Sequence, residues 1–282
     1  MTVSVVIPAK NEQQGLAQLL PDLIKIENLD EIIVVDDGSE DETKKICQEY
    51  GVTVISHPYS IGNGAAIKTG ARKAKGDVIV FMDADGQHSA RDVPRLIEEY
   101  KKGYCMVVGA RSRKSQASIG RWFANTFYNL FASWITGRKV RDLTSGFRVV
   151  NAQKFREFLS LLPNGFSYPT TSTMAFFRAG YSVAYVPIEV AKREGNSHLR
   201  IWKDGVRFLL IIFKVGTLYS PLKVFLPMSL AVFSTGLGYY IFTYLVSGRF
   251  TNMSALLFTT SLLIFMMGLI SEQITSLIYS QK

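Results

Sequence analysis

The chain has 282 residues and a formal net charge of +9, and its many hydrophobic residues are unevenly distributed. This length suits one large domain or a domain with an appendage, and the uneven distribution favours the second. The basic charge concentrates beside the most apolar segments, which indicates a membrane surface or phosphorylated substrates and argues against nucleic acid. Cys47 and Cys105 are isolated, so we expect two buried apolar residues rather than a disulfide or a metal pair.

The first two hundred residues alternate β-branched runs with helical patterns, which is typical of a mostly parallel sheet covered by helices. The first residues enter a strand pattern at once without a basic leader, so we expect no signal peptide. The predicted strands are Val3–Ile7, Glu31–Val35, Val52–Ser56, Asp77–Met82, Met106–Gly109 and Ser182–Val186. The predicted helices are Gln13–Ile26, Asp92–Lys102 and one that ends at Tyr50, opened by a capping box of Ser39 and Glu42.

Two long apolar segments lie near the end of the chain. Val224–Gly248 and Phe250–Ser271 contain no charged residue, and Arg249 separates them. Each exceeds the roughly 20 residues that cross a hydrocarbon core as a helix. The pattern predicts a transmembrane hairpin over residues 224–282, with buried core helices as the alternative. Because exposed hairpins invite association, a homo-oligomer is a further expectation.

Residues 200–223 mix spaced Lys and Arg with Trp, Phe and aliphatic residues. This mixture predicts helices lying in the headgroup plane, with an ordinary packing helix as the alternative. The segment from Lys192 to Lys223 contains seven basic residues and two acidic ones. Such an excess stays on the cytoplasmic side. We therefore expect a cytoplasmic domain over residues 1–199, an interfacial segment over 200–223 and a hairpin over 224–282.

Asp83, Ala84 and Asp85 form a DxD triad after the apolar run Val78–Met82. Two carboxylates at a strand end can hold a divalent cation against a diphosphate, as a nucleotide-sugar transferase requires. About one DxD is expected by chance in a chain of this length, so the interpretation depends on its neighbours. Oxygen donors favour Mg²⁺ or Mn²⁺ over zinc. We expect the adjacent His88 to be structural.

Further segments accompany the triad in a recognisable order. They are Ile7–Glu12, Val34–Ser39, Gly62–Ala66, Gly76–Asp77 and, around the triad itself, Asp83–His88. Together they resemble glycosyltransferase family 2, and Asp142–Arg148 resembles the DxTSGFR segment of polyprenyl-phosphate sugar synthases of the dolichol-phosphate mannose synthase type. The resemblance implies a GT-A α/β fold, a Rossmann-like, mixed and mostly parallel sheet, joined to a C-terminal transmembrane helical hairpin.

The resemblance also implies roles for individual residues. It assigns nucleotide-sugar binding to Pro8, Ala9, Asn11, Glu12, Asp36, Asp37, Gly64, Lys68, Asp83, Ala84, Asp85 and Arg193. Asp85 is the first choice as metal ligand, and the family pattern adds Asp83 and Gln87. Around Asp37–Ser39 we also expect an Asx turn with helix capping. Gly64 and Lys68 either approach a phosphate or belong to a turn before a helix.

The acceptor side departs from family members that act on hydroxyl groups. Those members often supply a carboxylate base from a late helix, whereas Gly165–Met174 contains no Asp or Glu. A phosphomonoester, whose second pKa is about 6, is largely ionised near pH 7 and can attack without a base. Arg111, Arg121 and Asn125 are the candidate ligands of its phosphate, because arginine matches phosphate geometry. Arg121, otherwise a surface cation, is assigned a catalytic role together with Asp85.

These features predict inverting transfer of a hexose from GDP-mannose or a UDP-sugar to dolichyl or polyprenyl phosphate, among membrane lipids on the cytosolic face. Arg193 precedes a loop, Glu194–His198, that we expect to close over the donor. One alternative is a family 2 enzyme that acts on a hydroxyl acceptor in polysaccharide or glycolipid synthesis. The other is a catalytically silent membrane scaffold, against which the intact carboxylates argue.

Overall fold

The computed structural model describes residues 1–111, 119–165, 167–190, 213, 216–217 and 219–280, with the side chains of 119–125 not described. It divides into two compact units, Met1–Leu199 and Arg200–Lys282, called here the N-terminal and C-terminal units. Most of the predicted interfacial segment 200–223 lies outside the described residues, as do Arg193 and its loop.

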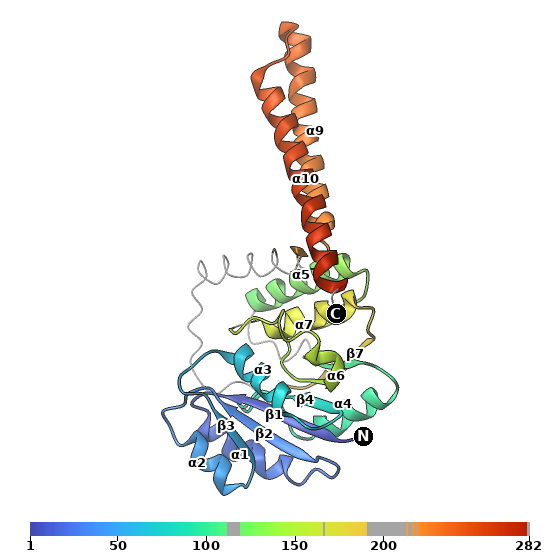
Figure 1. Cartoon of the computed structure of the whole chain (residues 1–282). Coiled ribbons are helices and arrows are strands. Elements are labelled where there is room, and N and C mark those ends of the chain that lie inside the picture. Colours follow the sequence, from blue (N-terminus) through green and yellow to red (C-terminus); the bar gives the residue numbers. More distant parts are fainter. Residues whose placement is uncertain (112–118, 166, 191–212, 214–215, 218, 281–282) are drawn as a thin grey trace. The chain divides into compact units, whose positions relative to one another are not determined.

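The N-terminal unit is built on a seven-stranded sheet in the order β3-β2-β1-β4-β6-β5-β7. Figure 1 labels β1, β2, β3, β4 and β7 of this sheet. The strands are β1 (Val3–Ala9), β2 (Glu31–Asp36), β3 (Thr53–Ser56), β4 (Val78–Phe81), β5 (Met106–Arg111), β6 (Arg148–Asn151) and β7 (Val183–Ile188). β6 runs antiparallel to β4 and β5, and all other neighbours pair in parallel. The predicted mixed, mostly parallel α/β sheet is confirmed, although the sequence patterns missed the short strand β6.

Helices cover both faces of this sheet. They are α1 (Gln13–Leu23), α2 (Thr43–Glu49), α3 (Asn63–Lys73), α4 (Asp92–Lys101), α5 (Ile119–Thr136), α6 (Ala152–Arg156) and α7 (Tyr168–Arg178). Apolar residues of α1 and α4 pack with Val3, Val5 and Ile7 in one buried cluster. α3 lies on the opposite face, where Gly70 leaves room for the Val6 side chain. This alternation follows from successive side chains of β1 pointing to opposite faces.

Two local predictions are wrong. The Ser39 hydroxyl does not cap α2, because it accepts a hydrogen bond from the Asn11 N–H at 2.9 Å. The Asp41 carboxylate instead accepts from the Thr43 N–H at 3.0 Å, where α2 begins. Cys47 is buried as expected, but Cys105 is half-buried, and its Sγ accepts a hydrogen bond from Lys154 Nζ. Both cysteines are free thiols, as expected.

Helices α9 (Pro221–Ser247) and α10 (Asn252–Ser280) form the C-terminal unit and are long and apolar enough to cross a membrane. Gly248 ends α9 with φ +63, a left-handed conformation that glycine adopts without strain. In the most apolar stretch of each helix, only 17% of the residues are buried. A core helix of a soluble protein would be mostly buried, so the membrane interpretation is favoured over that alternative.

The packing of this hairpin places mainly small residues inside, with Phe225 as a large exception, and many large apolar residues outside. α10 buries Ser254, Ser261, Gly268 and Thr275, one residue in every seven. The Ser229 hydroxyl of α9 donates to the Ser261 carbonyl at 2.9 Å, and the Ser261 hydroxyl donates to the Ser229 carbonyl at 3.0 Å. Close approach through small residues and interhelical hydroxyl bonds is typical of helix pairs in lipid. The exposed side chains include Leu226, Phe233, Leu245, Leu263 and Ile270.

We expect Gly268→Leu to separate the two helices, because a Cβ at position 268 would lie 2.7 Å from the Cβ of Phe225. The measurement is the rate of disulfide formation between cysteines introduced at Ser229 and Ser261, which should fall strongly. Gly238→Leu is the matched control, since a Cβ at position 238 meets no atom within 4 Å. Equal rates in both variants would contradict the helix packing described here.

Candidate active site

The carboxyl ends of β1, β2 and β4 meet at one edge of the sheet because these strands are parallel. Ala9 pairs with Asp36 across β1 and β2, and the Asp37 N–H donates to the Ala9 carbonyl at 2.8 Å. The Asp83 to Asp85 triad follows β4 at the same edge. The structure therefore brings together the strand-end segments that the sequence predicted as one site.

The loops after β1 and β2 are tied to each other. Asn11 has a positive φ of 55, and its side-chain oxygen accepts from the Glu40 N–H at 2.8 Å. The Glu12 N–H donates to the Thr43 hydroxyl at 3.0 Å. The predicted turn forms with Asp36 as its acceptor, since Asp36 Oδ1 accepts from the Ser39 N–H at 2.9 Å. Asn11 and Asp36 thus hold the two loops in fixed positions.

Asp37 organises the loop after β3. Its carboxylate accepts four hydrogen bonds, from His57 Nδ1 at 2.7 Å, Ser60 Oγ at 2.8 Å, the Ile61 N–H at 2.9 Å and the Gly62 N–H at 2.8 Å. Burial alone would raise the pKa of Asp37, but these donors outweigh it and leave the pKa below its ordinary value. A carboxylate offers about four acceptor sites, so all of them are used within the protein. Contact of Asp37 with a nucleotide stays a prediction.

Gly64 and Lys68 contact the chain before α7. A Cβ at position 64 would collide with the Pro163 carbonyl oxygen, and the Gly64 N–H donates to the Gly165 carbonyl at 3.2 Å. Lys68 Nζ donates to the Leu162 carbonyl at 3.2 Å and to the Asn164 side chain. Burial lowers the pKa of Lys68. These contacts agree with the turn-before-helix alternative, and a phosphate contact of Lys68 stays a prediction that requires its release from Asn164.

The triad is supported by two glycines from distant parts of the chain. Gly15 of α1 lies so close to the Ala84 carbonyl that a Cβ would overlap it. A Cβ at Gly146 would overlap the Asp83 carboxylate. Asp85 Oδ1 accepts from the Gln87 N–H at 3.2 Å, which folds the end of the triad into a tight turn. The glycines therefore allow protein backbone to approach the Asp83 carboxylate and the backbone between the two acidic residues.

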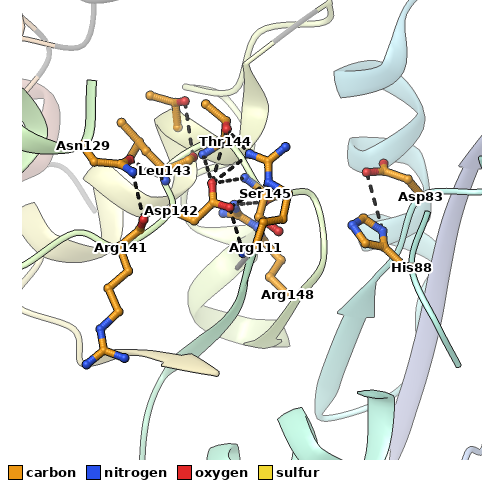
Figure 2. A network of polar contacts seen from close by, with 11 residues as sticks. Asp83, His88, Arg111, Asn129, Arg141, Asp142, Leu143, Thr144, Ser145 and Arg148 are labelled. Atoms are coloured by element: carbon orange, nitrogen blue, oxygen red, sulfur yellow. Dashed lines mark hydrogen bonds and ion pairs between the residues drawn. The ribbon is translucent and has the colours of Figure 1, made fainter. Parts of the chain in front are cut away.

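His88 lies beside the Asp83 carboxylate (Figure 2). Its Nδ1 is 3.9 Å from Asp83 Oδ2, and its ring packs on Phe147 with centroids 5.1 Å apart. The buried Nδ1 has no hydrogen-bond partner among the described residues. His88 is thus held by packing inside the protein, which agrees with a structural position.

The electrostatics of the triad suit a bound cation. Burial raises the pKa of Asp83, His88 opposes this, and the neighbouring charge of Asp85 raises it further. The Asp83 side chain nevertheless keeps 31% exposure. Within the described part of the chain, no three His, Cys, Asp or Glu side chains converge as a metal site. The two carboxylates and Gln87 fit a hard divalent ion that takes further oxygen ligands from a substrate.

Asp142 holds Arg111 in a two-pronged ion pair (Figure 2). Arg111 Nε donates to Asp142 Oδ2 at 2.8 Å, and Nη2 donates to Oδ1 at 2.9 Å. Asp142 Oδ1 also accepts from the N–H groups of Thr144 and Ser145, each at 3.1 Å. Burial would raise the pKa of Asp142, but Arg111 and the backbone donors lower it below its ordinary value. This pairing was not predicted, although both residues lie in segments that the sequence singled out.

Arg111, a predicted acceptor ligand, is therefore oriented by the Asp142 carboxylate, which pairs with its charge. The other predicted acceptor ligands, Arg121 and Asn125, lie on α5, and their side chains are outside the described set. α5 is itself anchored to the same segment, because Asn129 Nδ2 donates to the Arg141 carbonyl at 2.8 Å and its Oδ1 accepts from the Leu143 N–H at 3.1 Å. Their assignment to the acceptor phosphate stays a prediction.

We expect Asp142→Leu to destabilise the N-terminal unit by about 3 kcal/mol, since breaking a buried pair leaves one charge uncompensated. The double variant Arg111→Met with Asp142→Leu should lose less, because neither charge is then left unpaired. Thermal unfolding of the full chain in detergent measures both. A double variant less stable than Asp142→Leu alone would contradict the pairing.

Comparison with known proteins places the chain among glycosyltransferases. Residues 4–159 match the model of glycosyl transferase family 2, and residues 220–277 match the GtrB C-terminal hairpin. Glycosyltransferase AglJ of Haloferax volcanii is 25% identical, over 98% of this chain and 94% of AglJ. Undecaprenyl-phosphate 4-deoxy-4-formamido-L-arabinose transferase of Proteus mirabilis is 38% identical over 50% of this chain, and the match spans only 46% of that relative.

A solved structure shares the fold. Glucosyl-3-phosphoglycerate synthase from Mycobacterium tuberculosis, in complex with Mn²⁺, UDP-glucose and phosphoglyceric acid, superposes with a TM-score of 0.62 over 76% of this chain and 79% of its own. It is 20% identical, so it supports the GT-A-like architecture alone. Because the family model covers more than half of the chain, the protein belongs to glycosyl transferase family 2 and is a glycosyltransferase.

Proposed function

We propose that the protein transfers a hexose from a nucleotide diphosphate sugar to a polyprenyl phosphate on the cytoplasmic side of a membrane. The composition of helix α7 is the observation that supports a phosphate as the acceptor. Its sequence has no Asp or Glu, and Thr170 to Thr173 are wholly buried. The Thr173 hydroxyl donates to the Pro169 carbonyl at 2.8 Å, and the Ser172 hydroxyl donates to the same oxygen at 3.1 Å. A phosphomonoester acceptor needs no base from this helix.

The relatives support a lipid phosphate as acceptor. The name of the Proteus mirabilis relative specifies undecaprenyl phosphate, although its sugar is a modified arabinose rather than a hexose. The hairpin with large apolar residues on its surface suits an enzyme whose substrate stays in the bilayer. Exposing an isoprenoid to water costs about 0.8 kcal/mol per methylene, so the catalytic site must come to the headgroup.

On the donor side, we assign the nucleoside to the strand-end loops that contain Pro8, Ala9, Asn11, Glu12 and Asp36. Asp83, Asp85 and Gln87 would hold Mg²⁺ or Mn²⁺, which neutralises charge on the leaving diphosphate when bound. The Mn²⁺ and UDP-glucose in the mycobacterial structure are in keeping with this assignment. The protein itself supports the Asp83 carboxylate at Gly146 and the backbone between Asp83 and Asp85 at Gly15.

On the acceptor side, an oxygen of the lipid phosphate attacks the anomeric carbon opposite the diphosphate. The new bond joins that carbon to the phosphate oxygen, while the old bond to the diphosphate breaks and its electron pair leaves with the nucleotide diphosphate. Configuration is inverted, and no proton has to be removed. We assign the orientation of the phosphate to Arg111, Arg121 and Asn125, with Arg121 stabilising charge during transfer.

The surface of α5 supports contact of the N-terminal unit with headgroups. Phe127, Leu130 and Trp134 recur at helical spacing and are 60%, 64% and 51% exposed. The exposed cations Arg138, Lys139 and Arg141 follow the helix. Apolar side chains flanked by cations suit the boundary between acyl chains and anionic headgroups. The cytoplasmic side is proposed from the basic excess between Lys192 and Lys223.

Replacing Asp85 with alanine should abolish sugar transfer while leaving the chain folded and membrane-bound. The assay incubates membranes with labelled nucleotide sugars and polyprenyl phosphate and measures extractable sugar lipid. Asp22→Ala is the matched control, because Asp22 is an exposed carboxylate on α1 that pairs only at the surface with Lys25. Substantial activity in Asp85→Ala would overturn the metal assignment.

A fluorophore on a cysteine at Leu130 should be quenched by brominated lipids in proteoliposomes, because α5 would insert its apolar side chains among acyl chains. A cysteine at Tyr59, which is 68% exposed on the loop after β3, provides the control and should be quenched little. Cys105 is replaced by serine in both proteins to prevent labelling there. Equal quenching at the two positions would contradict the orientation.

A further inference from the structure

Gly146 forms one wall of the Asp83 carboxylate. A Cβ at position 146 would overlap Asp83 Oδ2 and lie 3.0 Å from both Oδ1 and the carboxyl carbon. The Asp83 side chain therefore rests directly on backbone of the loop between Asp142 and Arg148. Any shift of the Ser145 to Gly146 peptide moves the support of a carboxylate that we assign to the metal.

Three buried groups hydrogen-bond to the backbone of Ser145 and Gly146. The Tyr168 hydroxyl donates to the Gly146 carbonyl at 3.0 Å. An Nη2 hydrogen of Arg148 binds the Ser145 carbonyl, and Asp142 Oδ1 accepts from the Ser145 N–H at 3.1 Å. Tyr168 and Arg148 also contact each other, with the guanidinium 5.7 Å from the centre of the Tyr168 ring. The two carbonyls and the Ser145 amide are thus all held, which fixes the backbone that packs against Asp83.

Arg148 is a wholly buried cation whose hydrogen-bond partners among the described residues are neutral. Besides Ser145, its Nη1 donates to the Pro169 carbonyl at 2.9 Å, Ser172 Oγ at 2.8 Å and Thr173 Oγ1 at 3.1 Å. Through the Ser145 carbonyl, Arg148 holds the backbone that packs against the Asp83 carboxylate. The first turns of α7 are in this way connected to the carboxylate.

We infer that Tyr168 and Arg148 are positioning residues for Asp83, which act through the backbone of Ser145 and Gly146 and set the affinity of the site for its divalent ion. The inference rests on the proposed function, because it assumes that Asp83 takes part in holding the ion. Groups behind a metal ligand orient it, and their loss typically lowers metal affinity about 10- to 100-fold. Tyr168 would act without touching the ion or the substrates.

The test is retention of Mn²⁺ by the full-length protein in detergent, measured by equilibrium dialysis with UDP or GDP present. Tyr168→Phe removes one hydroxyl and should weaken Mn²⁺ retention about tenfold or more. Gly146→Ala should weaken it further, because the added Cβ displaces Asp83 directly. Tyr185→Phe is the matched control and should retain Mn²⁺ like the wild type, since its buried hydroxyl has no hydrogen-bond partner among the described residues.

Thermal unfolding of the variants without metal distinguishes the positioning of Asp83 from a simple loss of stability of the fold. A purely structural role of Tyr168 would lower the unfolding temperature and leave the Mn²⁺ affinity of the folded protein unchanged, which would overturn the inference. Wild-type affinity in Gly146→Ala would overturn it as well. If the wild type itself retains no Mn²⁺ with either nucleotide, the proposed metal site fails first, and the inference fails with it.

Discussion

The gathering of carboxylates at one edge of the sheet is the constraint on which the site depends. Parallel strands deliver Asp36, Asp37, Asp83 and Asp85 to that edge, and carboxylates that are removed from water need hydrogen-bond donors or a cation. The protein satisfies some of them itself. Asp37 receives four donors, and Asp142 nearby receives Arg111 and backbone amides. Among the described residues, Asp83 and Asp85 have fewer hydrogen-bond donors than Asp37, which supports our proposal that these two carboxylates hold a cation.

The two units of the chain obey opposite packing rules, and both follow from the surroundings that each surface meets. In the N-terminal unit, Val, Ile and Leu side chains fill the interior and polar groups lie outside. In the C-terminal unit, Ser and Gly residues lie between the helices and the large apolar residues face outward. In water the hydrophobic effect stabilises the first arrangement. In lipid that effect is absent between helices, so close packing and hydroxyl hydrogen bonds are the main attractions.

The sequence predicted those features that depend on local pattern. The β-branched runs predict parallel strands, whose carboxyl ends place Asp36 and Asp83 at one edge of the sheet. The two long segments without charged residues predict α9 and α10. Features made by distant segments were not predictable in the same way. The hydrogen bond between Lys68 and Asn164 depends on how the chain between α6 and α7 folds over the sheet. The contact of Gly146 with Asp83 depends in the same way on the loop before β6. The capping box failed because Ser39 serves a tertiary contact with Asn11.

Transfer to a lipid phosphate is tested by comparing two acceptors that differ only in the phosphate. The purified protein, reconstituted in vesicles with the donor it uses, is offered undecaprenyl phosphate or undecaprenol, and the labelled sugar lipid formed is measured. We predict transfer to the phosphate and none to the alcohol, since no carboxylate of α7 is available to remove a hydroxyl proton. Transfer to undecaprenol at a comparable rate, or label that enters only polymer, would contradict it.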